Sequence, residues 1–440
     1  MHSRILACWA GAAALGLGVA GPAAAAGFAV DDLNSAAQLG IGNAGAAAAA
    51  EDASTISANP AGIARLEAPQ FVGSGTLALP SIPFTNTGST LPTGMPISGP
   101  TDDGGPPILL PSFYWSSPLS DGFSIGFGLF PAFGLVTDYK FGWVGRYNAL
   151  ATELTSLDLA PTIAYRLLPN LSVGISPVAR YTKVKFTNAI DFGSAGAGLG
   201  IPGAVPGVGD GGAKLKVSGW SFAFNGGVLW EPTDTTRLGL AYFHNDAPKV
   251  TGSGTFQLPP VGSIISAATG AFTSTNASSV IGLPDHANFG IVQKLTSDLD
   301  VRGGVTWTQW SSFKQELITF ANPAQPPSLM VENWRDTISL SLGASYKLTP
   351  SWVLRGGLSY DETPVPDPQH RDLRLPDASR YGIAIGAGYA LSDSTTIDLA
   401  YQHLFGGTVS MHVVTSTADQ IVGTTNVSAD LLAFQVTYRY

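Results

Sequence analysis

Two glycine triplets in the sequence have the spacing that could bind the phosphates of a nucleotide. The first, Gly40, Gly42 and Gly45, forms the pattern G-x-G-x-x-G within "GIGNAGAAAAAEDASTISANPAG". A phosphate-binding turn of this type needs a preceding hydrophobic strand and a βαβ unit, and neither stands before Gly40. The second triplet, within 198–203, lies in a proline-containing segment and lacks the same context. The sequence therefore predicts no nucleotide binding, and we expect no cofactor.

Candidate nucleophiles and metal ligands are equally isolated. Ser124 stands in "GFSIG", which matches the nucleophile elbow G-x-S-x-G, but that motif needs a strand followed by a helix, and here a β-strand pattern begins. We expect no metal site, because the histidines show no paired spacing. They are His2, His244, His286, His370, His403 and His412. The protein is expected not to be an enzyme, although His403 and His412, near a late external loop, leave a barrel lipase open as an alternative.

The N-terminus has the features of a secretory leader. A positive residue precedes an apolar run over 5–20, and small residues follow it. These features predict that residues 1–26 form a signal peptide, cleaved after Ala25 or Ala26. The only cysteine, Cys8, lies in this leader, so the mature chain would have no disulfide and no cysteine-based metal site.

The composition of the remaining chain indicates a membrane protein without membrane helices. Charged residues make up only 12%, aromatic residues make up 10%, and there are 53 glycines. A net charge of −9 without a basic run argues against a nucleic-acid partner. Beyond the leader there is no apolar run of the roughly 18 residues that a transmembrane helix needs. An exported chain of this kind can cross a membrane as a closed β-barrel, so we expect it in the bacterial outer membrane.

Alternating segments support this barrel. In "TISLSLGASY", Ile338, Leu340 and Leu342 share one face, and glycine, serine and threonine occupy the other. A face exposed to water would carry many lysines and glutamates, whereas a barrel interior suits small polar residues. The connections between such segments alternate between short and long. We therefore predict an all-β fold, a fourteen-stranded antiparallel transmembrane β-barrel over residues 70–440. The strands are expected at 70–79, 109–117, 123–135, 153–166, 170–186, 219–230, 236–246, 287–295, 299–310, 337–347, 352–360, 380–390, 395–403 and 431–440.

Residues 27–69 precede the first strand and suit the interior of the barrel. They are rich in glycine and alanine and nearly uncharged. Asn59 can cap a helix and Pro60 fits its first position, so "NPAGIARL" predicts a short helix that leads into the first strand. We therefore expect this segment to form a hatch, or plug, that contains short helices.

Two long external connections and one strand carry a further signal. An exposed apolar patch usually marks a binding surface; the alternative is that the two connections pack on each other. Their apolar residues include Ile201, Val205, Val208, Leu258, Ile264, Ile265 and Phe272. In the third strand, Pro131 cannot donate a hydrogen bond to a neighbouring strand, and Gly134 makes the backbone more flexible. Together they predict a bulge or kink. The alternative there is that the strand ends at Phe130.

Several motifs together resemble the FadL-type outer-membrane transporters of long-chain fatty acids and other hydrophobic compounds. The resemblance runs along nearly the whole mature chain and rests on the order and spacing of its motifs. They are "EDASTISANPAGIARL", "FGLVTDY", "WVGRYNALATEL", "NWRDT", "LRGGLSYDETPVPD" and "RLPDASRYGIAIGAGY". It implies a plugged fourteen-stranded barrel. Ligand would pass from an external groove to an inner pocket, and then leave sideways at a kink in the third strand.

The resemblance also assigns roles to particular residues. Phe28 would lie beneath the pocket and Arg335 would meet a fatty-acid carboxylate; alternatively, Arg335 pairs with Asp336 or another acid. A second basic position of the family falls at Asn188, which would suit an uncharged substrate. The hatch motif would be Asn59, Pro60 and Ala61, the kink Pro131, Phe133 and Gly134, and the structural lumen pair Asp377 and Arg380.

The expected function is passive uptake of long-chain fatty acids or related lipophilic compounds, with uncharged hydrocarbons as the alternative by the same route. No nucleotide motif or energy-coupling element is visible, so transport should be downhill. Expected partners are the hydrophobic ligand, outer-membrane lipid and lipopolysaccharide, with the protein acting as a monomer. A general porin remains a competing possibility from another class.

Overall fold

The computed structural model describes residues 27–440, and the predicted signal peptide lies outside this part. Fourteen antiparallel strands form a closed barrel, as predicted. The barrel closes because β1 pairs with both β3 and β19. The wall strands are β1 (Gln70–Ser81), β3 (Ile108–Pro118), β4 (Phe123–Asp138), β5 (Ala151–Leu168), β6 (Leu171–Ile190), β7 (Gly211–Thr233), β8 (Thr236–Asn245), β11 (His286–Lys294), β12 (Leu299–Thr308), β15 (Thr337–Lys347), β16 (Trp352–Asp361), β17 (Arg380–Ala390), β18 (Thr395–Val414) and β19 (Gln420–Arg439).

The alternation that predicted the strands separates the outside of the wall from its inside. On β15 and β16 the outward side chains Leu340, Leu342 and Leu358 are exposed at the barrel surface. Their inward neighbours are glycines and serines, which leave room for the hatch. Within residues 27–440, no helix is long and apolar enough to cross a membrane.

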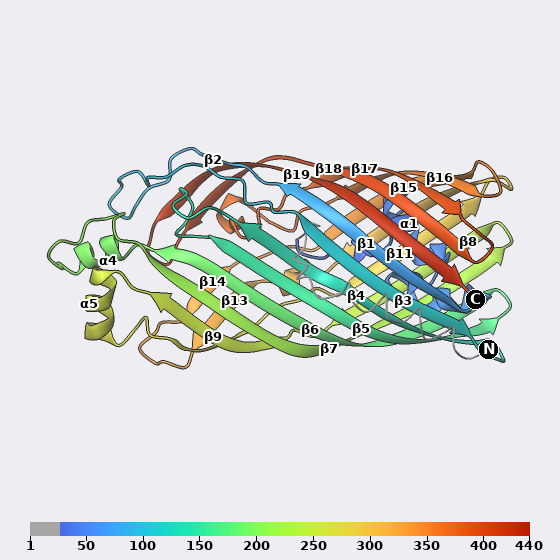
Figure 1. The fold of residues 1–440 in the computed structure, drawn as a ribbon, viewed down its shortest axis with the longest axis horizontal. Coiled ribbons are helices and arrows are strands. Elements are labelled where there is room, and N and C mark those ends of the chain that lie inside the picture. Colours follow the sequence, from blue (N-terminus) through green and yellow to red (C-terminus); the bar gives the residue numbers. More distant parts are fainter. Residues whose placement is uncertain (1–26) are drawn as a thin grey trace, which may run out of the picture.

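The wall continues beyond the membrane into the long connections. In Figure 1, β9, β13, β14, α4 and α5 lie at the end opposite to the C-terminus. The shorter elements are β2 (Phe84–Asn86), β9 (Lys249–Gln257), β10 (Thr275–Val280), β13 (Gln315–Phe320), β14 (Ser328–Val331), α4 (Phe192–Gly198), α5 (Pro260–Thr269), η3 (Trp310–Ser312) and η4 (Pro368–His370).

These elements and the longer wall strands correct the predicted strand bounds. β7 begins at Gly211, and β18 and β19 stay paired as far as Val414 and Gln420. Outside the bilayer a strand needs no apolar outer face, so the pattern that identified the wall strands is missing there. Backbone pairing still satisfies the N–H and C=O groups, which extends the strands.

The hatch lies inside the barrel and consists of short helical turns. Its α2 contacts β8 and β11, and η2 contacts β5, β6 and β7. The turns are η1 (Asp31–Leu33), α1 (Ala36–Leu39), α2 (Ala46–Ala49), α3 (Thr55–Ala58) and η2 (Pro60–Arg65). The glycine triplet at 40–45 therefore serves turns that pack against the wall.

Candidate functional site

The N-terminal end of the hatch is buried in an aromatic cluster. Phe28 is 1% exposed, and its ring centroid lies 4.8 Å from that of Trp310 and 5.3 Å from that of Phe313. The rings of Trp334 and Phe133 lie 5.9 and 5.8 Å away. Edge-on and tilted contacts at these distances are favourable for aromatic rings. The hatch therefore places one phenylalanine in an aromatic cage inside the barrel.

The cage has a tight base at Gly27. This residue has a φ of +61°, and a Cβ there would lie 2.5 Å from Cζ2 of Trp310 and 2.7 Å from Cζ3 of Trp334. Only glycine fits both the conformation and the space. Aliphatic residues of the external connections and of the upper wall surround the aromatic rings; among them are Leu154, Val184, Leu215, Val217, Val250, Ile281, Leu283, Ile318, Val365 and Leu375.

Strand β4 bulges beside this cluster. Its alternation stops at 130–135, where six consecutive residues are buried, and its register against β5 shifts between Pro131 and Gly134. The bulge binds the hatch instead. Val30 N–H donates to Ala132 O at 2.9 Å, and Gly134 N–H donates to Phe28 O at 2.7 Å. The expected irregularity is therefore present, and the strand does not end at Phe130.

The bulge separates β4 from β3. Pairing between the two strands stops at Phe113 and Leu129, whereas β3 remains paired with β1 as far as Ile108. Asn34 of the hatch bridges the separated strands: Ser112 Oγ donates to its Oδ1 at 2.9 Å, and its Nδ2 donates to Pro131 O at 2.9 Å. One buried hatch side chain thus spans the gap between the strands.

The Asn59-Pro60-Ala61 motif fixes the other end of the hatch. Asn59 Oδ1 accepts from Ala61 N–H at 3.0 Å, which caps η2, and Nδ2 donates to Ala47 O at 2.7 Å and Val228 O at 3.0 Å. The predicted cap is present, although the helix it starts is a 3-10 helix. A Cβ at Gly227 would lie 2.0 Å from Asn59 Oδ1, so a glycine in the wall lets the motif approach.

The predicted external ligand residues divide into exposed and packed groups. Val205 and Ile264 are exposed, Ile201 and Leu258 are half-buried, and Ile265 is buried. In a further contact, the half-buried ring of Phe272 lies 5.1 Å from that of Phe192 and 5.6 Å from that of Phe256. Helices α4 and α5 contact each other as well. The two connections therefore pack on each other and still present apolar side chains to the outside.

Arg335 does not lie in the aromatic cluster. Its side chain is 54% exposed, and its Nη2 lies 3.7 Å from Oε1 of Glu362. The neighbouring Trp334 occupies the cluster instead, at 3% exposure. Asn188, at the second basic position, donates to Ala189 O. Arg335 thus pairs with an acid, which is the alternative given for it, and contact between Arg335 and a ligand headgroup stays a prediction.

The lumen pair Asp377 and Arg380 is buried where the hatch begins. Arg380 Nη2 lies 3.3 Å from Asp377 Oδ1 and 3.3 Å from Asp361 Oδ2. Thr363 Oγ1 donates to Asp377, and so does Gly27 N–H. Burial raises the pKa of Asp377 to about 6. Asp377 thus binds Gly27, the first described residue of the hatch, and the pair has a structural role.

Two buried glutamates flank the aromatic cluster on its external side. Glu316 shares the inward face of β13 with Ile318, a member of the cluster, and Glu332 lies two residues before Trp334. Burial raises the pKa of Glu316 to about 7 and that of Glu332 to about 8. The nearby charged groups are Asp372 and Arg374, which pair with each other at 3.0 Å. Acids therefore outnumber cations beside the cluster.

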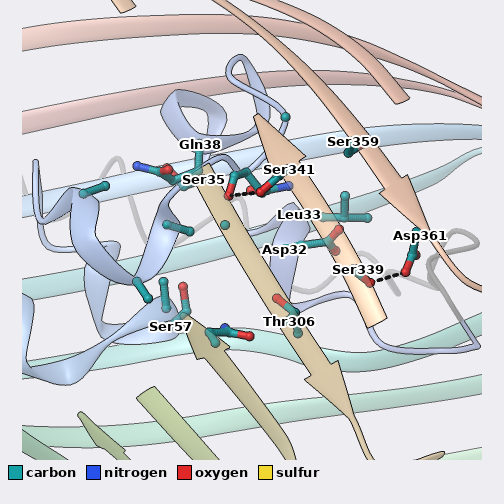
Figure 2. Close-up of a pocket in the computed structure, with 18 of the residues that line it drawn as sticks. Asp32, Leu33, Ser35, Gln38, Ser57, Thr306, Ser339, Ser341, Ser359 and Asp361 are labelled. Carbon is teal, nitrogen blue, oxygen red and sulfur yellow. Dashed lines mark hydrogen bonds between the residues drawn. The ribbon is translucent and has the colours of Figure 1, made fainter. Parts of the chain in front are cut away.

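A cavity of about 160 Å³ with a mixed polar and apolar lining lies between the hatch and the wall, and Trp310 of the aromatic cluster borders it. Figure 2 shows Asp32, Ser35, Gln38 and Ser57 of the hatch facing wall residues that include Ser341. Ser341 Oγ donates to Asn43 O of the hatch at 3.4 Å.

The candidate catalytic groups Ser124 and His403 lie on separate strands of the wall, β4 and β18. Ser124 is a buried strand residue of β4, paired with Ala164. His403 Nδ1 lies 2.7 Å from Asp430 Oδ1, and its ring packs on Phe405. Within residues 27–440, no group of His, Cys, Asp and Glu side chains could hold a metal ion.

Sequence reasoning missed the residues that close the cluster: Trp310, Phe313, Trp334 and Asn34. The three aromatic residues lie in connections after β12 and β14, where no strand alternation indicates which side chains point inward. A concentration of aromatic residues within external connections was the available signal.

Comparisons with known proteins agree with this architecture. A family model described as "Outer membrane protein transport protein (OMPP1/FadL/TodX)" matches residues 16–440. The long-chain fatty acid transport protein of Salmonella typhi is 26% identical over 380 residues, 82% of this chain and 84% of the relative. The 47 kDa outer membrane protein of Pasteurella multocida is 28% identical over 436 residues, 96% of each chain.

Solved structures show the same fold. A Pseudomonas aeruginosa FadL homologue superposes with a TM-score of 0.85 at 24% identity, covering 94% of this chain and 100% of that one. The Ralstonia pickettii toluene transporter TbuX superposes with a TM-score of 0.66 at 18% identity, covering 93% and 100%. At these identities the likeness concerns the fold.

Proposed function

Because this chain belongs to the outer membrane protein transport family (OMPP1/FadL/TodX), whose members carry fatty acids or hydrophobic aromatic compounds, we propose that it takes up an uncharged hydrophobic molecule. The outer membrane is its location. Transport is passive, driven by the concentration gradient and by the transfer of apolar surface out of water.

The observation that carries this proposal is the position of Phe28. It fills an aromatic cage in the barrel and lies on the hatch segment that binds the bulge of β4. A ligand that takes the place of the Phe28 ring would displace the same residues that cover the gap between β3 and β4. Binding and lateral exit are then coupled through the hatch segment 28–34.

The entry side of this route is the apolar surface formed by α5 and the segment that follows α4. Leu199, Val205, Val208 and Ile264 are between 52% and 65% exposed there. Exposed apolar residues at the external end of the barrel fit a first contact with a greasy molecule. Phe272, Phe256 and Phe320 line up in ring contacts that lead from these helices toward the cluster.

The charges near the route support an uncharged substrate over a fatty acid. Arg180, whose guanidinium lies 4.8 Å from the Phe133 ring, is held by both oxygens of Asp158 at 2.6 Å. Arg374 is paired with Asp372. A carboxylate headgroup would thus meet cations that are already neutralised, so the cost of removing it from water would not be offset. An uncharged molecule meets no such penalty.

The test compares two ligands of equal length, an alkylbenzene and a fatty acid, on the purified protein. Trp310 and Trp334 lie in the cage, so ligand binding there should change their fluorescence. We expect tighter binding and faster cellular uptake of the alkylbenzene. Tighter binding of the fatty acid would instead assign the protein to fatty-acid uptake, as the name of the Salmonella relative describes for that protein. A large steady ion current through the purified protein would refute both and indicate a porin.

A further inference from the structure

Lysines gather on one side of the barrel wall. The chain contains nine lysines, and five of them lie on the three neighbouring strands β6, β7 and β9: Lys183, Lys185, Lys214, Lys216 and Lys249. β7 pairs with both β6 and β9, so the five residues occupy one continuous sheet surface. Figure 1 shows these strands running toward the external end of the barrel.

The outward face of β6 and β7 changes character along its length. On β7, Phe224, Phe222 and Trp220 are exposed one after another, and Lys216 and Lys214 follow on the same face. β6 repeats this order, because outward Tyr181 is followed by Lys183 and Lys185.

The rings of Tyr181 and Trp220 lie 5.1 Å apart and mark the aromatic girdle at the membrane interface. The lysines of β6 and β7 come directly beyond this girdle, on the external side, and Lys249 lies beside Gly219 at the level of the girdle. They therefore face the headgroup layer of the outer leaflet.

The positive charge of this surface is poorly neutralised within the protein. Lys185 lies directly opposite Lys216 in the β6–β7 register, and like charges in that position destabilise a sheet. One carboxylate, Glu153 of β5, is shared by Lys183 at 3.3 Å and Lys185 at 3.9 Å. Lys214 and Lys216 continue the patch beyond the reach of that carboxylate. The four lysines of β6 and β7 face one shared carboxylate, so this part of the wall keeps a positive charge that favours binding of anions from outside the chain.

We propose that this surface, Lys183, Lys185, Lys214, Lys216 and Lys249, is a binding site for the phosphate groups of outer-leaflet lipopolysaccharide. The geometry matches that lipid, because its acyl chains would lie on Phe222 and Phe224 and its sugars on Trp220 and Tyr181. Its phosphates would then reach the lysines. Lysine binds phosphate as a mobile point charge, which suits a lipid that diffuses along the wall. The site is independent of the transport route, since every residue in it points outward.

The probe is bisphosphorylated lipid A, bound to the purified protein in detergent and counted by native mass spectrometry. The variant is K185S/K216S, which removes the facing pair. A lysine near an anionic lipid surface contributes about five-fold to affinity, so the double variant should bind lipid A about 30-fold more weakly. The matched control is K294S/K347S, which removes two lysines at the periplasmic ends of β11 and β15. It removes the same charge and should leave lipid A binding unchanged.

Two further probes separate the possible sources of the signal. Lipid A without its phosphates should bind the wild-type protein and K185S/K216S equally, because only acyl contacts remain. Soluble pyrophosphate should fail to displace lipid A at equal concentration. The proposal is overturned if K185S/K216S binds lipid A like the wild type, if the control loses as much, or if pyrophosphate competes equally. The electrophoretic mobility shift of a folded barrel checks that each variant is native, and uptake of the hydrophobic ligand should stay unchanged.

Discussion

A disulfide between cysteines introduced at the positions of Ala29 and Phe133 should stop transport if the hatch must move. The two residues face each other in an isolated antiparallel bridge, flanked by the hydrogen bonds Val30 N–H to Ala132 O and Gly134 N–H to Phe28 O. This is the non-hydrogen-bonded arrangement, in which Cα atoms lie about 4.5 Å apart, within the range of a disulfide. The variant A29C/F133C would therefore join the hatch to the bulge of β4 with little distortion.

The contacts that the disulfide reinforces are weak enough to open without it. Two backbone hydrogen bonds contribute about 1 kcal/mol each, and burial of the Phe28 side chain about 2 kcal/mol. Withdrawing Phe28 from the cage then costs about 4 kcal/mol, which leaves Phe28 withdrawn in about one molecule in a thousand without ligand. A ligand must supply this energy, which corresponds to about five buried methylene groups. Uptake by the wild-type protein should therefore rise steeply with alkyl chain length up to about that number.

The assay is uptake of a labelled alkylbenzene into cells, before and after reduction with dithiothreitol. Oxidised A29C/F133C should transport at the background rate, and reduction should restore uptake. If the predicted leader containing Cys8 is removed, the remaining chain has no native cysteine, so the wild type should not respond to reduction. The single variants A29C and F133C control for the lost side chains. Equal uptake by the oxidised and reduced double variant would refute the idea that the hatch must move.

Three further perturbations test the exit, the cover of the gap and the charge beside the cage. The double variant P131V/G134V should flatten the bulge, so that binding persists while uptake is lost; joint loss would argue against a separate exit. N34A removes two hydrogen bonds of about 1 kcal/mol each, so initial uptake should rise at least about ten-fold. Burial raises the pKa of Glu332 to about 8, above its ordinary value of 4.5, so the folded state holds the extra proton and its stability falls as pH rises between these values. Fatty-acid affinity should accordingly fall between about pH 7 and 9, and E332Q should remove most of that dependence, as titration of tryptophan fluorescence can show.

The wall strands could be predicted because every second residue faces lipid and must be apolar. Leu340 and Leu342 had to point outward, and the bulge followed from a proline that cannot donate and a glycine that weakens the strand. Outside the bilayer the outward residues need not be apolar, so this alternation is lost. β9 and β13 carry polar or mixed outer faces, so nothing in their sequence distinguishes them from irregular loops.

The residues of the aromatic cluster could not be predicted from the sequence for a related reason. In "NWRDT" the charged residue looked like the ligand contact, yet Trp334 points into the cage and Arg335 points out. The segment follows β14 without strand periodicity, so neighbouring residues cannot be assigned to a face. Asn34 was missed because its role depends on two strands that separate only in three dimensions.

The contacts along the hatch indicate how much of it can move. Beyond residue 34, the hatch is tied to the wall by charged and buried groups. Arg302 binds Glu51, Arg237 donates to Ala48 O at 3.0 Å, and Asn59 donates to Val228 O at 3.0 Å. Breaking such a buried ion pair costs about 3–5 kcal/mol by itself, as much as all the contacts of Phe28 and its two hydrogen bonds. A ligand that binds in the cage can therefore release residues 28–34 while the rest of the hatch remains in place. The barrel would then open sideways at β4 without opening a path to the periplasm.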